Sequence, residues 1–131
     1  MLTENEDTFA AALKSDLNKP FQEAILSEID MLKNDVIGLL RHIDEWTATQ
    51  YCEKSPVTLF DKVYIHPEPY GVALVIGAWN FPLLLTMAPV LPAIAAGNAV
   101  ILKPSEISPA TAKALEDLVP KYLDTSCIKV I

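Results

Sequence analysis

Two apolar runs in the second half of the chain each lead into polar side chains of types that enzymes use. Residues 71–76 lead into Asn80, and residues 98–102 lead into Lys103 and Glu106. If both runs are neighbouring parallel strands, their carboxyl ends lie side by side at the edge of the sheet where ligands bind. The pattern therefore predicts one site that combines an amide, an ammonium group and a carboxylate.

The amide of Asn80 allows two interpretations. Its NH2 group could donate a hydrogen bond to an oxyanion that develops during a reaction. Its carbonyl oxygen could instead cap a helix that we expect over residues 81–96. The residue type alone favours the cap, because asparagine is common at that position, although the two roles use different atoms of the same group.

Lys103 and Glu106 also allow two interpretations. An acidic group near the carboxyl end of the second strand of a doubly wound sheet can hold ribose hydroxyls, and a lysine adds a donor and a positive charge. The alternative is a solvated loop with two ordinary charges. Neither G-x-G-x-x-G nor the P-loop motif occurs in the chain, so neither of these phosphate-binding loops is expected.

The cysteines and histidines show no pattern typical of a site. Cys52, Cys127, His42 and His66 have the spacing of neither a disulfide framework nor a metal centre. A Ser/His/Asp arrangement is not present either. We expect free thiols in a reducing cytoplasm and no bound metal.

The first half of the chain, which must support these side chains, has the pattern of helices. Phe9, Leu13 and Leu17 form one stripe, which Asn18 and Pro20 should end. A second helical region follows, with apolar residues at alternating spacings of four and three: Ile25, Ile29, Leu32, Val36, Leu39, Ile43 and Trp46. This seam either packs on its own domain, with a break near Asn34 or Gly38, or forms an interface with another chain.

The second half alternates strands and helices. Residues 71–76 have the composition of a strand that is buried on both faces, and the helix over 81–96 should end at Gly97 and be shortened by Pro89 and Pro92. Ser108, followed by Pro109, should cap a helix that extends to about residue 123. Residues 127–131 begin a third strand, whereas residues 57–66 have the composition of an isolated one.

These elements indicate an α/β protein with N-terminal helices and the first half of a Rossmann-like parallel sheet. We expect three regions: an N-terminal helical region over 1–56, an extended strand and turn excursion over 57–70, and an incomplete Rossmann-like cofactor-binding domain over 71–131.

Charge and composition exclude several classes of protein. The net charge of −7 and the pI of about 4.7 make nucleic acid an unsuitable partner. The acidic N-terminus is typical of neither a signal peptide nor a transit peptide. The uncharged stretch over 72–102 is interrupted by proline, glycine and asparagine, which favours a strand–helix–strand unit over a membrane span. We therefore expect a cytoplasmic protein.

Four motifs together resemble the aldehyde dehydrogenase superfamily. They are Pro69-x-Gly-Val72, Ile76-Gly-x-Trp-Asn-Phe-Pro82, Ala95-Ala-Gly-Asn98 and Leu102-Lys-Pro-Ser-Glu106. The early helices and the segment Tyr64-Ile-His-Pro-Glu-Pro69 are similar to the class-3-like branch, which includes fatty-aldehyde enzymes. The resemblance covers essentially the whole chain, but only the N-terminal part of the family's fold.

The resemblance implies a role for each candidate residue. Asn80 would be the amide that steadies the oxyanion when a cysteine thiolate attacks an aldehyde, before hydride passes to NAD or NADP. A glutamate would then activate the water that releases the carboxylic acid. Lys103 and Glu106 would hold the adenosine ribose, and Trp79 with the backbone near Ile76 would line the cofactor cleft. A carboxylate at residue 106 leans towards NAD.

The family's glycine-rich segment, glutamate base, catalytic cysteine and C-terminal oligomerisation strand have no counterpart in these residues, and neither Cys52 nor Cys127 matches the nucleophile motif. We therefore expect the 131 residues alone to be inactive. The alternatives are a non-catalytic short isoform that pairs with a full-length enzyme, a helical interaction module, and a partial gene model of a longer protein. The family implies a small aldehyde substrate and a homodimer, and any membrane-anchoring tail would lie beyond Ile131.

Overall fold

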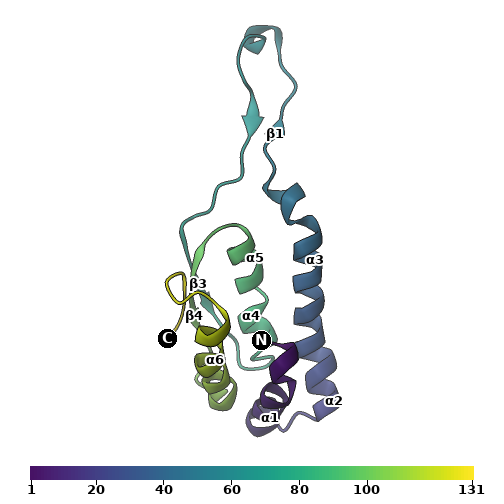
Figure 1. Cartoon of the computed structure of the whole chain (residues 1–131), viewed down its shortest axis with the longest axis vertical. Helices are drawn as coiled ribbons and strands as arrows, with labels where there is room; N and C mark the ends of the chain where they lie inside the picture. The colour runs from purple at the N-terminus through teal and green to yellow at the C-terminus, as the bar shows by residue number, and fades with distance from the viewer.

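The N-terminal part of the chain is helical in the computed structural model, which describes residues 1–131 (Figure 1). A 3-10 turn over Thr3–Asn5 leads into α1 (Glu6–Leu17). Asn18 ends α1 in the left-handed region with a φ of 54°, so the predicted end of this helix is confirmed. One long helical segment follows, made of α2 (Phe21–Ala24), the π-helical η2 (Ile25–Ile29) and α3 (Asp30–Thr47).

A narrow arm follows α3 in the chain and projects away from the body of the molecule, beyond the end of α3 (Figure 1). In it, β1 (Gln50–Tyr51) pairs antiparallel with β2 (Tyr64–Ile65), and a 3-10 turn covers Pro56–Thr58. The strand that we expected over residues 57–66 is therefore only two residues long, and its partner lies within the region that we expected to be helical. The arm exposes several large apolar side chains: Tyr51, Val57, Leu59, Phe60, Tyr64 and Ile65.

The second half of the chain forms a parallel sheet with helical connections, which confirms the predicted α/β class. The strands β3, β4 and β5 are hydrogen-bonded in that order. Short helices α4 and α5 connect β3 to β4, and the longer α6 connects β4 to β5. Their bounds are β3 (Val72–Ile76), α4 (Leu84–Met87), α5 (Val90–Ala95), β4 (Ala99–Lys103), α6 (Pro109–Tyr122) and β5 (Ile128–Val130).

The helical connection between β3 and β4 is broken in two at Pro89, as predicted, whereas Pro92 lies within the first turn of α5 and does not interrupt it. Pro89 separates α4 from α5, because a proline inside a helix removes a backbone donor and clashes with the preceding turn. Gly97 follows α5 with a φ of 88°, a conformation that an L side chain rarely adopts, so the predicted helix end is also confirmed.

The apolar seam of the second helical segment packs within the chain at Ile29 and Leu32 and becomes more exposed towards Trp46, which is 56% exposed. Ile29 and Leu32 are fully buried, and α3 contacts α4 and α5. This packing favours the interpretation of the seam as an intramolecular helix face. The break expected near Asn34 or Gly38 is absent, because α3 continues through both residues.

One face of the sheet is open, which corrects the expectation that β3 is buried on both faces. Val75 is buried with the helices, whereas Val72, Leu74 and Ile76 are 64%, 59% and 67% exposed. The physical reason is that α4, α5 and α6 contribute to a single core on the face of Val75. None of the helices combines the length and the apolar character that crossing a membrane needs.

Candidate functional site

The carboxyl ends of β3 and β4 lie side by side, as the sequence predicts. Ile76 is paired with Lys103 in the parallel register, and the backbone amide of Gly77 donates to the carbonyl of Lys103 at 2.8 Å. The loop with Trp79 and Asn80 and the loop with Glu106 therefore start from adjacent positions at one edge of the sheet. This is the edge where open parallel sheets bind ligands.

Asn80 is exposed, and its side chain makes no hydrogen bond within the chain. The cap that we expected from Asn80 is therefore wrong. Helix α4 starts at Leu84, too far along the chain for Asn80 to cap it, and a carboxylate from the N-terminal helices accepts the amides at its start instead. Both polar atoms of the Asn80 amide remain available to a bound molecule.

That carboxylate belongs to Glu28, which lies within η2. Its Oε2 accepts from the backbone amides of Leu83 and Leu84 at 2.9 and 3.0 Å. Its Oε1 is paired with the ammonium group of Lys19. Both members of the pair are buried, with Glu28 at 0% and Lys19 at 6% exposure. A buried charge is stable only when it is paired and hydrogen-bonded in this way.

The helix that follows the second loop is capped in the same manner. Ser108 does not cap α6, contrary to our expectation, because its hydroxyl donates to the carbonyl of Trp79 at 3.2 Å. Asp16 of α1 accepts from the amides of Ala110 and Thr111 at 3.0 and 2.8 Å, and from the Thr111 hydroxyl at 2.7 Å. The Ser108–Trp79 hydrogen bond thus joins the two loops of the site.

Sequence reasoning missed Glu28, Lys19 and Asp16 as supports of the site. A signal was available for Glu28, which is spaced by four residues from both Ala24 and Leu32 and so lies on the apolar face of its helix. A carboxylate on a buried face requires a partner, and the sequence does not say which one.

Lys103 and Glu106 form an ion pair at the end of β4, with 2.8 Å between Nζ and Oε2. The hydrogen bond from Lys103, a backbone hydrogen bond and the nearby positive charge together hold the pKa of Glu106 below its ordinary value. The carboxylate is exposed and remains ionised at neutral pH, so it can accept hydrogen bonds from hydroxyl groups.

A groove of about 500 Å³ adjoins this ion pair. Its volume lies within the range of about 300–1,000 Å³ that is usual for small-molecule sites. Charged side chains and apolar surface both contribute to it. The lining residues are Lys103, Pro104, Glu106, Pro109, Ala112, Lys113, Glu116, Val130 and Ile131.

Gly77 permits the close approach between the end of β3 and α4. A Cβ atom at this position would lie 2.0 Å from the hydroxyl oxygen of Thr86, which is buried and has no hydrogen-bond partner. Real Cβ atoms do not approach other heavy atoms this closely, so the position requires glycine. Ile76, just before it, projects onto the open face of the sheet.

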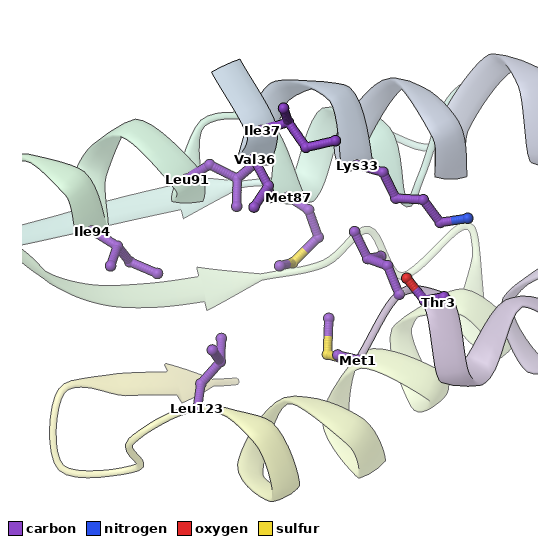
Figure 2. Close-up of a pocket in the computed structure, with 10 residues that line it drawn as sticks. Met1, Thr3, Lys33, Val36, Ile37, Met87, Leu91, Ile94 and Leu123 are labelled. Atoms are coloured by element: carbon purple, nitrogen blue, oxygen red, sulfur yellow. The ribbon is translucent and has the colours of Figure 1, made fainter. Parts of the chain in front are cut away.

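A second pocket, of about 430 Å³, lies away from these loops (Figure 2). Met87, Leu91 and Ile94 line it from α4 and α5, and Val36 and Ile37 line it from α3. Its one charged side chain, Lys33, is already paired with Glu6 and Asp30. Most of the other lining residues are hydrophobic, so the pocket is mainly an apolar hollow.

The two cysteines lie apart from the candidate site. Cys52 follows β1 in the arm and is paired through its backbone with Val63. Cys127 immediately precedes β5, which is at the amino end of the parallel strands, whereas Asn80 follows the carboxyl end of β3. Both are free thiols.

Comparisons with known proteins match the chain over its whole length. A model of the aldehyde dehydrogenase family matches residues 1–131. The dimeric NADP-preferring aldehyde dehydrogenase of Canis lupus familiaris is 42% identical over 131 residues, which are 100% of this chain and 29% of that protein. The chloroplastic aldehyde dehydrogenase family 3 member I1 of Arabidopsis thaliana is 46% identical over 131 residues, or 100% of this chain and 24% of that protein.

Solved structures agree as well. A substrate-bound AldH of Staphylococcus aureus has a TM-score of 0.96 and 34% identity, and the match covers 99% of this chain and 28% of that one. A succinic semialdehyde dehydrogenase of Streptococcus pyogenes in complex with NADP+ has a TM-score of 0.85 and 26% identity, with 99% and 28% coverage. The chain spans about a quarter of the length of the curated relatives it matches.

Proposed function

Because the chain belongs to the aldehyde dehydrogenase family, we propose that it supplies the oxyanion amide and the adenosine-ribose site of an enzyme that oxidises an aldehyde to a carboxylic acid with NAD or NADP. The observation that supports this proposal is the placement of Asn80 and the Lys103–Glu106 pair on loops that leave adjacent strands at one sheet edge. A reacting carbonyl and the sugar of a dinucleotide would then bind on neighbouring loops.

In this proposal the NH2 group of Asn80 donates to the aldehyde oxygen as negative charge develops on it. A donor that is fixed before the reaction lowers the barrier more than a solvent molecule that must reorient. The freedom of Asn80 from any helix cap supports this role, because neither of its polar atoms is occupied within the chain. The dinucleotide, when bound, supplies the acceptor for the hydride that the aldehyde carbon loses.

The residues of the groove fit the adenosine half of a dinucleotide. Glu106 presents an ionised carboxylate to ribose hydroxyls, and Lys103 adds a donor. Pro104, Pro109 and Ala112 offer small apolar surface to an adenine ring. The half-exposed Trp79 lies on the adjoining loop and would line the cleft with the backbone near Ile76. Both NAD and NADP remain candidates, since the names of relatives mention NADP.

We further propose that these 131 residues do not oxidise aldehydes by themselves. Covalent oxidation of this kind needs a thiolate close to the oxyanion donor. Cys52 lies in the arm and Cys127 lies at the opposite edge of the sheet, so neither is placed beside Asn80. The nucleophile and the base would come from residues outside this chain.

The arm suggests how the whole protein assembles. Large apolar side chains cover it, including the fully exposed Val57 and Phe60, and exposed apolar surface of this kind often marks an interface. A relative is named as dimeric. We therefore propose a homodimer in which the arm takes part.

The test begins with the native protein, whose mass and peptide coverage beyond Ile131 are measured first. Its aldehyde-dependent reduction of NAD and NADP is then assayed, together with an Asn80→Ala variant. Loss of the oxyanion donor should lower kcat by about 10²–10³-fold while the dinucleotide still binds. A native protein without aldehyde oxidation, or an unchanged kcat in the variant, would refute the proposal. Turnover by the 131-residue chain alone would refute its inactivity.

A further inference from the structure

We propose that Glu28 and Lys19 are positioning residues that hold the Asn80 loop from the N-terminal helices. The inference rests on the proposed function for the meaning of Asn80, but its structural part is independent of activity. Neither residue touches the Asn80 side chain. They act on the residues that follow it, and so determine where the amide of Asn80 is presented.

The first attachment of the loop is the carboxylate of Glu28. It accepts the amides of Leu83 and Leu84 at 2.9 and 3.0 Å, three and four residues after Asn80. Leu83 is itself fully buried, so its amide has no access to water as a substitute partner. Removing the acceptor would therefore leave a buried donor unsatisfied, which proteins avoid.

The second attachment is the ammonium group of Lys19. It pairs with Oε1 of Glu28 and lies 4.2 Å from the centroid of the Phe81 ring. Phe81 is the residue directly after Asn80, so the cation contacts the loop one position from the amide. A desolvated cation over an aromatic ring adds to the stability of such a contact.

Irregular backbone conformations occur beside Lys19 and at Glu28. Asn18 adopts a left-handed conformation, which ends α1 and turns Lys19 inward. Glu28 lies in the π-helical η2, an extra-residue turn inside an otherwise regular helix. Such turns are rare and occur frequently at functional sites. Two irregularities of the N-terminal region therefore coincide with the two residues that hold the loop.

The other loop of the site has its own support, which allows the two to be separated. Asp16 holds the start of α6 through Ala110 and Thr111, after the loop with Lys103 and Glu106. Weakening the hydrogen bonds that Glu28 accepts should disturb the Asn80 loop. Weakening those that Asp16 accepts should disturb the groove beside Lys103 and Glu106.

Amide hydrogen exchange on the full chain tests the structural part. In the Glu28→Gln variant, exchange of Leu83 and Leu84 should accelerate about tenfold more than exchange in β4, since a neutral amide oxygen replaces the charged acceptor of their hydrogen bonds and accepts more weakly. The matched control is Glu6→Gln, which weakens the partly exposed pair between Glu6 and Lys33 that joins α1 to α3. This control should leave the ratio of the amide exchange rate at Leu83 to the exchange rates in β4 unchanged.

Two further variants guard against a failure to fold. Lys19→Arg keeps the charge and should retain slow exchange at Leu83 and Leu84. The double variant Lys19→Met/Glu28→Gln leaves no unpaired buried charge, and it should still show the local acceleration. Equal acceleration throughout the chain, or unchanged exchange at these two amides in a folded variant, would overturn the inference.

Kinetics of the native aldehyde-oxidising protein test the consequence for the reaction. The Glu28→Gln substitution should lower kcat about tenfold to a hundredfold, with little change in the KM for the dinucleotide, because small displacements of a catalytic group are costly. Asp16→Asn should instead raise that KM. Equal effects of both variants on both constants would overturn the inference. Absence of turnover in the unsubstituted protein would refute the proposed function. The hydrogen-exchange comparison tests independently of activity whether Glu28 and Lys19 hold the Asn80 loop.

Discussion

Glu28 and Leu83 are 55 positions apart in the chain, yet Oε2 of Glu28 accepts the backbone amide of Leu83 at 2.9 Å. This contact joins the N-terminal helices to the first loop of the candidate site. Asp16 makes the equivalent connection to the second loop through Ala110 and Thr111. The N-terminal region thus supports the site although none of its residues lines the groove beside Lys103 and Glu106.

Breaking the buried pair from the cationic side should destabilise the chain strongly. In Lys19→Met, the carboxylate of Glu28 stays buried without its counter-ion, and we expect the free energy of unfolding to fall by about 3–5 kcal/mol. Urea denaturation measures the change. Lys33→Met is the control, because its partners are partly exposed, and it should reduce the free energy of unfolding much less than Lys19→Met does. Similar losses in the two variants would contradict this prediction.

Gly77→Ala should lower the stability by about 1–3 kcal/mol, because the new Cβ would meet the hydroxyl of Thr86 and force the end of β3 away from α4. Thermal unfolding followed by circular dichroism measures the effect. Gly38→Ala provides the opposite control. Nothing lies within 4 Å of that position, so alanine in the helix interior should stabilise by about 0.5–1 kcal/mol. A neutral Gly77→Ala would show that the strand end is not tightly packed.

Glu106→Gln should shift the choice of dinucleotide towards NADP in the active protein. The carboxylate repels a 2′-phosphate, and its removal leaves Lys103 free to attract one. We expect the ratio of kcat/KM for NADP to that for NAD to rise by about tenfold or more. Glu116→Gln is the matched control, since Glu116 lines the same groove but is paired with Lys113. An equal shift in both variants would indicate a general effect of charge.

The Lys103–Glu106 pair should also be visible in a titration. The hydrogen bond from Lys103 lowers the pKa of Glu106 in the folded chain, so its stabilising contribution is present above the ordinary value of about 4.5 and is lost as the pH falls through the lowered folded value. Carbon-13 NMR of the side-chain carboxyl measures this pKa. In Lys103→Met it should rise, whereas the pKa of Asp124, which Ser126 lowers, should stay unchanged.

The order of strands and helices in the second half followed from local pattern. The apolar runs, the paired prolines and Gly97 determine where β3, α4, α5 and β4 begin and end, because each acts through the backbone of neighbouring residues. The loops that carry Asn80 and Glu106 start side by side, which followed from the parallel arrangement of β3 and β4. These features are local or topological, and the sequence expresses them directly.

The supports of the site could not be predicted in the same way. The residue types of Asn80 and Ser108 suit a helix cap, but α4 begins four residues after Asn80, and carboxylates from distant helices accept the first amides of both α4 and α6. Ser108 instead donates to the carbonyl of Trp79, and the side chain of Asn80 makes no hydrogen bond within the chain. The open face of β3 was missed for a related reason, since the number of faces that are covered depends on where the helices pack. Contacts between segments far apart in sequence decided each of these outcomes.

The carboxylates of Glu28 and Asp16, which cap α4 and α6, also limit where an anion can bind. In many doubly wound folds the phosphates of a dinucleotide bind at a helix end, because free amides and the helix dipole attract anions there. In this chain Glu28 already occupies the start of α4 and Asp16 the start of α6. An approaching phosphate would meet like charge and satisfied donors at both positions. In the proposed function, the pyrophosphate of the dinucleotide would therefore bind away from both helix ends, as suits a chain that has no G-x-G-x-x-G loop.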